Sequence, residues 1–239
     1  MAPLIASTAG AVVARSWLFV PATRSERFAK AAASGADMVI VDLEDAVPAE
    51  EKDAARAEAA AWLSEDGAGA VRVNPVDSPH HADDIAALAG LPGLRAVLVP
   101  MADSADALAA VHDQLGPDVA VVAQVETARG LLQAVDLASA PGVLRLAFGH
   151  LDFAFDVDAA PEPEAMAHAR SSLVVASRAA GTAGPIDSVT TDLDDDGATV
   201  RDAARARAFG FTGKLCIHPR QVAAVNEAMS PTDAQVTWA

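Results

Sequence analysis

The hydrophobic and polar positions of the chain follow two rhythms. Short runs rich in Val, Leu, Ile and Phe are separated by Ala-rich stretches in which apolar residues recur at intervals of three and four. The first rhythm is typical of strands and the second of amphipathic helices. The runs cover residues 16–22, 37–44, 69–75, 95–101, 119–126, 143–152, 185–191 and 213–219, and the clearest helix candidates cover 25–35, 50–63, 104–115 and 197–210. Strands that alternate with helices in this way predict an α/β fold with a parallel sheet.

The ends of three successive runs are evenly spaced. Pro100, Glu126 and Asp152 close these runs at intervals of 26 residues, which is the length of one strand and helix unit. Eight such units in 239 residues predict a single-domain (β/α)8 TIM barrel. A doubly wound open sheet is the alternative, but no G-x-G-x-x-G motif follows the first strand to support dinucleotide binding.

The two termini are expected to lie outside this repeat. Residues 1–14 contain an apolar run but lack the basic start of a secretory signal, because the first Arg is Arg15. We therefore predict an N-terminal extension at the surface over residues 1–14 and a barrel domain over residues 15–239.

Composition narrows the possible partners and the cellular setting. The net charge is −16, and no run of Lys or Arg offsets it, so nucleic acid and anionic membranes are excluded as main partners. Cys216 is the single cysteine and lies in an apolar stretch, which predicts a reducing, cytoplasmic setting. No stretch is long and apolar enough to predict a membrane span.

Polar and charged residues gather at the carboxyl-terminal ends of the predicted strands. In a barrel these ends meet at one rim, where active sites lie. The residues concerned are Asp42, Glu44, Asp45, Arg72, Asn74, Glu126, Asp152 and His218. Three carboxylates within four positions repel one another unless a cation or a basic group lies between them, so the stretch VDLED is expected to serve a shared site.

Glu126 and Asp152 are the candidate metal ligands. They close adjacent predicted strands, so both carboxylates can reach one hard divalent cation while water and substrate oxygens complete its octahedron. This arrangement predicts Mg²⁺. The alternative is that either acid only caps the helix that follows it. His150 is expected to share a strand face with Asp152, two positions away.

Arg72 is a charged residue in the otherwise apolar strand VRVNP. A buried guanidinium needs an anionic partner. We predict that it binds a substrate carboxylate or a developing enolate, and the alternative is a structural ion pair with Asp42 or Glu44. A Schiff-base mechanism is disfavoured, because Lys30 and Lys52 fall in helices or loops and Lys214 starts a strand at the end away from the site.

Five ordered motifs resemble the HpcH/HpaI aldolase and citrate lyase beta-subunit family. They are RSWLFVPATRSERFAKAAASGADMVIVDLEDAV, VRVNP, VETARGLL, LAFGHLDFAFD and GFTGKLCIHPRQVAAVNEAMSP, and they extend from Arg15 to about Pro231. The resemblance implies a magnesium-dependent barrel that cleaves or forms carbon–carbon bonds in short 3-hydroxyacyl thioesters of the citryl, malyl or citramalyl type, on CoA or an acyl carrier. It also implies a homo-oligomer, with or without a partner subunit.

The same resemblance assigns roles to individual residues. It implies that Glu126 and Asp152 bind magnesium, with Glu126 also near the substrate, and that Arg72 contacts the substrate. Glu44 and Asp45 are expected to orient metal-bound water and Arg72, or to supply the catalytic base. Arg15, Arg24 and Lys52 fall where relatives contact carrier phosphates, although a solvated helix face is an equal alternative for basic residues after a strand.

Two features depart from the family pattern. Met101 follows Pro100 where many relatives carry Lys, and the C-terminal lid segment of longer relatives is expected to be missing or very short after PTDAQVTWA. We therefore keep two alternative functions, a class II aldolase on free 2-oxo acids such as pyruvate, and a non-catalytic accessory subunit that binds metal and acyl-CoA.

Overall fold

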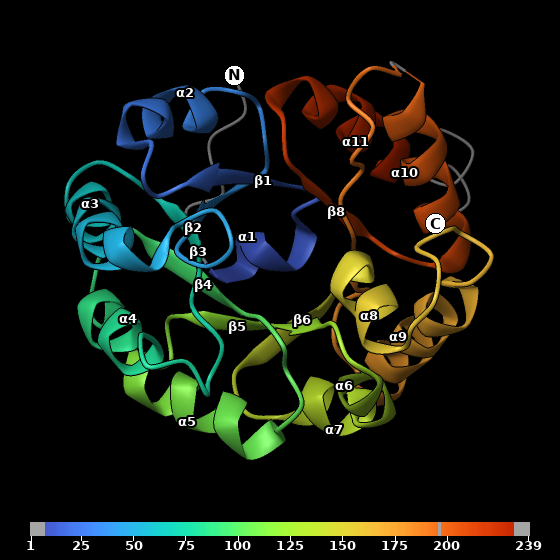
Figure 1. Cartoon of the computed structure of the whole chain (residues 1–239), viewed down its shortest axis with the longest axis horizontal. Coiled ribbons are helices and arrows are strands. Elements are labelled where there is room, and N and C mark those ends of the chain that lie inside the picture. Colours follow the sequence, from blue (N-terminus) through green and yellow to red (C-terminus); the bar gives the residue numbers. More distant parts are fainter. Residues whose placement is uncertain (1–7, 196, 232–239) are drawn as a thin grey trace.

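Eight parallel strands close into a barrel, and helices surround it (Figure 1). The computed structural model describes residues 8–195 and 197–231. The strands are β1 (Ser16–Pro21), β2 (Met38–Asp42), β3 (Gly69–Arg72), β4 (Leu94–Val99), β5 (Ala120–Val125), β6 (Val143–Phe148), β7 (Ile186–Asp187) and β8 (Gly213–Cys216). Each strand pairs with the next, and β8 pairs with β1, so the predicted (β/α)8 barrel is confirmed.

The helices alternate with the strands along the chain, and α1 precedes β1. They are α1 (Thr8–Val13), α2 (Phe28–Ala32), α3 (Lys52–Ser64), α4 (His81–Leu88), α5 (Ala105–Leu115), α6 (Ala128–Leu132), α7 (Ala134–Ser139), α8 (His150–Asp156), α9 (Ala167–Ala180), α10 (Ala198–Phe209) and α11 (Val222–Met229). Three 3₁₀ turns, η1 (Ser25–Arg27), η2 (Ala49–Glu51) and η3 (Pro219–Gln221), precede α2, α3 and α11. None of the helices in these described residues has the length and apolar character needed to cross a membrane.

The strand residues divide between two apolar layers. Alternate side chains such as Ile40, Leu98 and Val122 fill the interior of the barrel, whereas Val39 and Val41 pack outward against the helices. Both faces of a parallel sheet are buried in this architecture, which explains why the strands are almost continuously apolar. A polar side chain on the inner face therefore stands out, and those near the carboxyl end of the barrel form the candidate site.

The sixth predicted strand is wrong at its carboxyl end. β6 ends at Phe148, and α8 begins at His150, so His150 and Asp152 lie in the first turn of a helix and not on a strand face. The apolar residues of α8 continue the pattern of the strand without a break, with Phe153 and Ala154 buried. Gly149 is the single residue that separates the two elements.

The amino-terminal end of the barrel is closed by a helix. Residues 8–13, expected to belong to a surface extension, form α1, which lies across the barrel in Figure 1 and contacts β4 and β6. Ala11 and Ala14 are completely buried beside Trp17. This part of the expected extension belongs to the barrel core. The lid segment, which we expect to be missing or very short, would begin beyond Pro231, and residues 232–239 lie outside the described residues.

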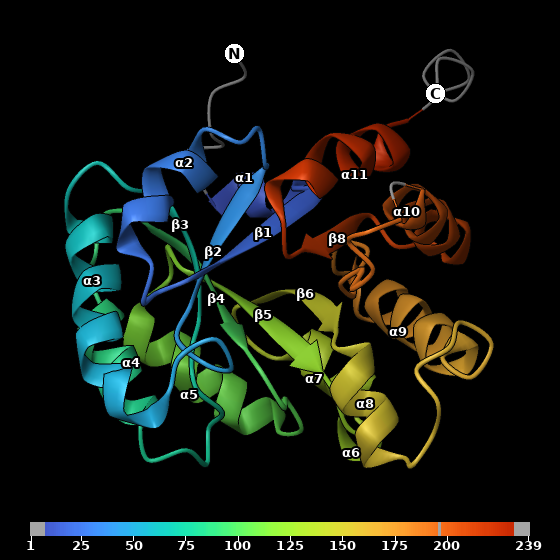
Figure 2. The ribbon, with the colours of Figure 1, turned by 45° about the horizontal axis from the view of Figure 1, so that its top comes forward.

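The carboxyl-terminal ends of the strands remain accessible. In Figure 2 the ends of β4, β5 and β6 point to the side that carries α8, away from α1 and both ends of the chain. Because α1 fills the opposite end, a small ligand can reach the barrel interior at the carboxyl-terminal rim.

Candidate active site

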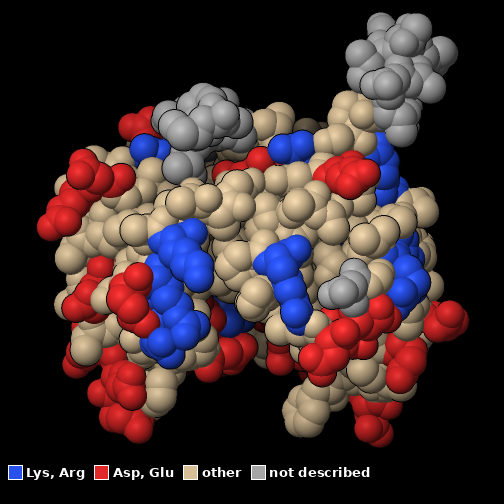
Figure 3. Space-filling view, turned by 90° about the horizontal axis from the view of Figure 1, so that it is seen from above, with Lys and Arg blue, Asp and Glu red and all other residues tan. Residues whose placement is uncertain are grey.

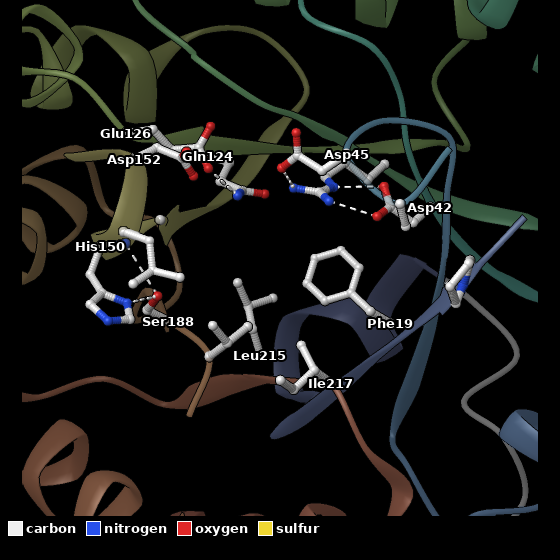
Figure 4. Close-up of a pocket in the computed structure, with 16 residues that line it drawn as sticks. Phe19, Asp42, Asp45, Gln124, Glu126, His150, Asp152, Ser188, Leu215 and Ile217 are labelled. Atoms are coloured by element: carbon white, nitrogen blue, oxygen red, sulfur yellow. Dashed lines mark hydrogen bonds and ion pairs between the residues drawn. The ribbon is translucent and has the colours of Figure 1, made fainter. Parts of the chain in front are cut away.

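A cavity of about 360 Å³ lies at the carboxyl-terminal rim of the barrel (Figure 4). Its residues come from the strands and from the loops directly after them, as expected for an active site of this fold. The lining residues are Phe19, Pro21, Asp42, Asp45, Ala46, Arg72, Gln124, Glu126, Gly149, His150, Leu151, Asp152, Ser188, Val189, Leu215 and Ile217. Five of the residues predicted for the rim therefore line one cavity, namely Asp42, Asp45, Arg72, Glu126 and Asp152.

Glu126 and Asp152 meet at one side of this cavity. Glu126 follows β5 and is 2 % exposed, and Asp152 reaches it from the first turn of α8. The two carboxyl groups lie side by side in Figure 4. Burial raises the pKa of Glu126 to about 8, and burial together with the charge of Asp45 raises the pKa of Asp152.

The Glu126 carboxylate is held by its neighbours. Its Oε2 accepts a hydrogen bond of 2.9 Å from the backbone N–H of Met101, and its Oε1 accepts one from Gln124 Nε2. Met101 adopts a φ of 51°, an uncommon conformation for a residue with a side chain. Gly149 leaves room for the carboxylate, because a Cβ atom at position 149 would overlap the Glu126 side chain.

Arg72 lies between three acidic side chains from the β2 loop. Its Nε and Nη2 donate to the two oxygens of Asp42 at 2.7 and 2.6 Å, and its Nη1 donates to Asp45 at 3.3 Å. Burial alone would lower the pKa of Arg72, but the hydrogen bonds and charges of Asp42, Glu44 and Asp45 raise it. The structural ion pair considered from the sequence is therefore present.

Glu44 and Asp45 occupy different positions around Arg72. Asp45 lines the cavity and its side chain is 67 % exposed. Glu44 does not line the cavity, and its Oε2 lies 2.7 Å from Arg72 Nη1 but outside hydrogen-bond geometry. Burial raises the pKa of Glu44 to about 7, with Arg72 opposing this effect and Asp45 and Asp42 adding to it. Glu44 is thus poised to exchange a proton near neutral pH.

The residues at this site fit a magnesium ion. Two adjacent carboxylates with raised pKa values, one buried at Glu126 and one exposed at Asp152, are stabilised by a divalent cation, and the glycine at position 149 keeps the space around Glu126 open. No group of three His, Cys, Asp or Glu side chains in the described part of the chain could hold a metal ion. A two-carboxylate site of this kind suits Mg²⁺, which usually keeps several waters and binds substrate oxygens.

A second polar pair, His150 and Ser188, also lines the cavity. His150 Nδ1 is hydrogen-bonded to Ser188 Oγ, which also accepts the backbone N–H of His150 at 3.2 Å. Burial, with the nearby charge of Arg170 adding to it, lowers the pKa of His150 to about 4. His150 is therefore neutral at pH 7.

Lys214 does not reach the cavity. It is 1 % exposed, donates to the carbonyl of Ser188, and lies 3.7 Å from Asp187. Asp187 in turn pairs with Arg170 at 2.9 Å. This buried network lies between the barrel and α9, and it agrees with the exclusion of Lys214 as a Schiff-base lysine.

The three residues predicted to contact carrier phosphates lie in different surroundings. Arg15 precedes β1, at the amino-terminal end of the barrel, and pairs with Asp37 at 2.8 Å. Lys52 is 8 % exposed and donates to the carbonyls of Leu43 and Glu44 at 2.7 and 2.8 Å. The structure therefore does not bring Arg15 to the site, and it gives Lys52 a role in holding the loop of acids.

Arg24 remains at the rim that holds the cavity. It follows β1, its side chain is 48 % exposed, and its Nε donates to Glu26 at 2.7 Å. On the face shown in Figure 3, basic side chains gather in a few groups while acidic ones line much of the edge.

Sequence reasoning missed Gln124, Gly149 and Ser188. Gln124 is a polar residue on the inner face of β5, 3 % exposed, and its Oε1 has no hydrogen-bond partner. The pattern A-Q-V-E does place Gln124 on the same strand face as Glu126. Gly149 and Ser188 gave no such signal, because their roles depend on which loops meet in space.

The match to known proteins covers the whole of this site. The HpcH/HpaI aldolase/citrate lyase family matches residues 15–219. The chain belongs to this family. The match includes every lining residue of the cavity, so the resemblance seen in the five sequence motifs is confirmed.

Individual relatives show what this family contains. A citrate lyase subunit beta-like protein of Deinococcus radiodurans is 37 % identical over 92 % of this chain and 81 % of its own length. A (3S)-malyl-CoA thioesterase of Cereibacter sphaeroides is 34 % identical over 94 % of this chain and 80 % of its own. The solved citrate lyase beta subunit of Mycobacterium tuberculosis, in complex with oxaloacetate and magnesium, superimposes with a TM-score of 0.80 at 35 % identity, over 92 % of this chain and 99 % of that one.

Proposed function

We propose that this protein is a magnesium-dependent carbon–carbon lyase that acts on a short 3-hydroxyacyl thioester. The observation that carries the proposal is the adjacent carboxylate pair of Glu126 and Asp152, placed in one cavity with the guanidinium of Arg72. Relatives named as citrate lyase beta-like proteins and as a malyl-CoA thioesterase support a thioester substrate. The magnesium and oxaloacetate bound to the related M. tuberculosis subunit support the metal and the 2-oxo acid.

In this proposal Glu126 and Asp152 hold the magnesium ion. Bound there, the ion would polarise the oxygens of the 2-oxo acid portion and stabilise negative charge. The N–H of Met101 and the amide of Gln124 keep the Glu126 carboxylate in place, and Gly149 keeps the space around it free. Gln124 Oε1, which has no partner in the structure, is available to accept a hydrogen bond from the substrate or from water.

Cleavage of such a thioester needs a base and a site for an enolate. The base removes the proton of the 3-hydroxyl group, the bond between C2 and C3 breaks, and its electron pair passes to the thioester carbonyl as an enolate. The hydroxyl carbon becomes the carbonyl of the 2-oxo acid, and protonation of the enolate gives the acyl thioester. Asp45, which lines the cavity, and Glu44, whose pKa is raised to about 7, are the two candidate bases.

Arg72 supplies the positive charge for the anion in the cavity. Asp42 fixes the guanidinium plane through two hydrogen bonds, and Nη1 donates to Asp45, which lines the cavity. A preorganised donor that need not reorient during reaction is effective in stabilising developing negative charge. Arg72 is therefore assigned to the substrate carboxylate or the enolate oxygen, and Asp42 to its orientation.

Product analysis on the purified protein tests this function. With Mg²⁺ present, malyl-, citramalyl- and citryl-CoA should release a 2-oxo acid and an acyl-CoA, at a turnover within the ordinary enzyme range of about 1–1,000 per second for the true substrate. Removal of magnesium with EDTA should abolish the release, and added Mg²⁺ should restore it. Metal-independent cleavage, or binding of thioester without any cleavage, contradicts the proposal, and the second result would favour an accessory subunit.

Hydrolysis of the thioester is the second candidate reaction. The thioesterase relative supports it, and so does the exposed carboxylate of Asp45, which water can reach at the rim of the cavity. The same assay separates the two, because hydrolysis releases free CoA and a hydroxy acid, whereas cleavage releases acyl-CoA and a 2-oxo acid. Cleavage of free hydroxy acids at a comparable rate would instead indicate an aldolase without a carrier.

A further inference from the structure

The two proposed magnesium ligands are held in different ways. Glu126 receives a hydrogen bond on each of its oxygens, from the backbone N–H of Met101 and from the amide of Gln124. The Asp152 side chain is exposed, and its position depends on α8, the helix that carries it. The groups that hold α8 therefore decide whether the second carboxylate meets the same ion.

α8 has few contacts of its own that fix its first turn. It contains seven residues, of which only Phe153 and Ala154 are buried. Its N-cap is Gly149, which has no side chain to accept a hydrogen bond from the first turn. A helix of this length is not stable by itself, so contacts from other segments are needed to hold it.

Ser188 supplies such a contact from the loop after β7. It lines the cavity and is 2 % exposed. Its Oγ accepts the backbone N–H of His150 at 3.2 Å and is also hydrogen-bonded to Nδ1 of the same residue, and Figure 4 shows both contacts. One hydroxyl group thus fixes the backbone and the ring of the first residue of α8. Asp152 lies two positions later, in the same helical turn.

Ser188 is itself held in place by a buried network. Its carbonyl accepts a hydrogen bond from Lys214, and the neighbouring Asp187 pairs with Lys214 at 3.7 Å and with Arg170 at 2.9 Å. All three charged side chains are buried. The Ser188 hydroxyl group is therefore a fixed point against which α8 can be oriented.

The other connections of α8 are weaker. The register between β6 and β7 is a single pair, Ala147 with Ile186, so the strands give little support to the segments that follow them. The far end of α8 is tied through Asp156, which accepts the backbone N–H of Ala128 at 2.7 Å, but this hydrogen bond is exposed. Water competes for an exposed hydrogen bond, so the buried contact at Ser188 holds the helix more firmly.

We propose, on the basis of the proposed function, that Ser188 positions the magnesium ligand Asp152 by fixing the first turn of α8. Magnesium demands near-ideal octahedral geometry with ligand distances of about 2.0–2.1 Å, so a small displacement of one carboxylate weakens binding. Residues that orient a ligand without touching the ion typically contribute about 10-fold to 100-fold to metal affinity. Ser188 is thus a positioning residue and acts through the helix.

Removal of the hydroxyl group tests this role. In Ser188→Ala the first turn of α8 loses both contacts, so magnesium affinity, measured by calorimetry without substrate, should fall roughly tenfold. Ser177→Ala is the matched control, because Ser177 is a buried serine on α9 whose Oγ has no hydrogen-bond partner among the described residues. Its magnesium affinity should equal that of the wild type. Ser188→Thr keeps the oxygen and should bind magnesium within about threefold of the wild type.

Two results would overturn the positioning role, and a third would overturn more. Equal magnesium affinity in the wild type and Ser188→Ala shows that the contact is not needed. Binding by Ser188→Thr as weak as that by Ser188→Ala shows that the oxygen is not responsible. If the wild type itself binds no magnesium, the proposed function fails together with the positioning role.

A double-mutant cycle shows whether Ser188 acts through Asp152. Ser188→Ala should weaken magnesium binding in the wild-type background but should cause no further loss in Asp152→Ala, where the carboxylate that it positions is already missing. The rise in Tm over a series of Mg²⁺ concentrations reports the affinity of each variant, including weak ones. A further loss of roughly tenfold in the Asp152→Ala background would mean that the two effects are independent, and it would overturn the proposal.

Discussion

The barrel contains a buried arginine at each end, and the two have opposite surroundings. Arg72, at the carboxyl end, lies among Asp42, Glu44 and Asp45. Arg145, at the amino end, is completely buried and donates to carbonyl oxygens, among them those of Ala14 and Gly184 at 2.7 and 2.9 Å. Its guanidinium also lies 5.9 Å from the ring centroid of Trp17.

The surroundings change the chemistry of the same side chain. Burial lowers the pKa of Arg145 to about 9, whereas the acids around Arg72 raise its pKa despite burial. Arg145 donates to carbonyl oxygens of α1 and of the loop before β7, and these hydrogen bonds join both segments to the barrel. Arg145 therefore has a structural role. Arg72 is paired with acids and lines the cavity, so it is the arginine for which we propose a role in function. The role of a buried arginine in a barrel strand therefore has to be inferred from the groups it contacts, because both of these arginines are buried.

Conservative replacement of each arginine should produce the largest contrast. Arg72→Lys keeps the charge but loses the planar fork that contacts two carboxylates, so turnover should fall roughly 100-fold. Arg145→Lys loses several carbonyl contacts, so the free energy of unfolding should fall by about 2 kcal/mol, while turnover changes less than about threefold. Steady-state kinetics and urea unfolding of both variants measure these effects. A large loss of turnover in folded Arg145→Lys would break the distinction between the two ends.

Replacement of Gly149 should weaken the metal site without removing a ligand. In Gly149→Ala the new methyl group displaces the Glu126 carboxylate, so magnesium affinity should fall roughly tenfold or more. Gly181→Ala is the matched control, because Gly181 ends α9 at a φ of 74° with open space around it. That variant should lose about 1 kcal/mol of stability with no change in magnesium affinity. Equal magnesium affinity in the two variants would mean that the space beside Glu126 is not needed.

Magnesium binding should strengthen as pH rises through the raised pKa values at the carboxyl end. Without metal, Glu126 and Glu44 have folded pKa values of about 8 and 7, above the ordinary glutamate value, so they stabilise the protein at low pH and this contribution is lost as pH rises to 8. Magnesium competes with these protons, and its affinity should rise up to about tenfold per unit between pH 6 and 8. Calorimetry in two buffers of different ionisation enthalpy should detect the released protons. A pH-independent affinity with no proton release would contradict the ligand assignment.

The smallest expected effect is at Met101. Its φ of 51° is strained for Met but tolerated by Asn, and its contact with Glu126 is made by the backbone N–H. Met101→Asn should therefore stabilise the protein by about 0.5–1 kcal/mol and leave magnesium affinity unchanged. Thermal unfolding with and without Mg²⁺ measures both quantities. Weaker magnesium binding in this variant would show that the Met101 side chain, and not its backbone, supports the site.

The fold was predictable because each strand carries its own signal. The apolar runs and the 26-residue interval between Pro100, Glu126 and Asp152 reflect one strand and helix unit at a time. The boundaries between elements were harder to predict, because they depend on a few residues at each junction. The sequence FGHLDF gives no break between β6 and α8, so Asp152 was placed on a strand although it lies in a helix.

The site was only partly predictable because its members meet through tertiary contacts. Asp42, Arg72 and Glu126 lie together because they are at the carboxyl-terminal ends of parallel strands. The predicted fold class was enough to expect this. Arg145 in VLRLAF resembles Arg72 in VRVNP as a sequence, and the periodicity alone could not show that one faces acids and the other faces carbonyls. Likewise, the need for glycine at 149 arises from a side chain 23 positions earlier, at Glu126.

The central claim is that Glu126 and Asp152 form the magnesium site at the carboxyl end of the barrel. Calorimetric titration of Mg²⁺ into the wild-type protein, Glu126→Gln, Asp152→Asn and the control Glu58→Gln tests it most directly, because Glu58 is an exposed acid on α3. The predicted result is tight binding by the wild type and the control, and at least about 100-fold weaker binding by each site variant with an unchanged circular dichroism spectrum. Unchanged magnesium affinity in both site variants would contradict the account.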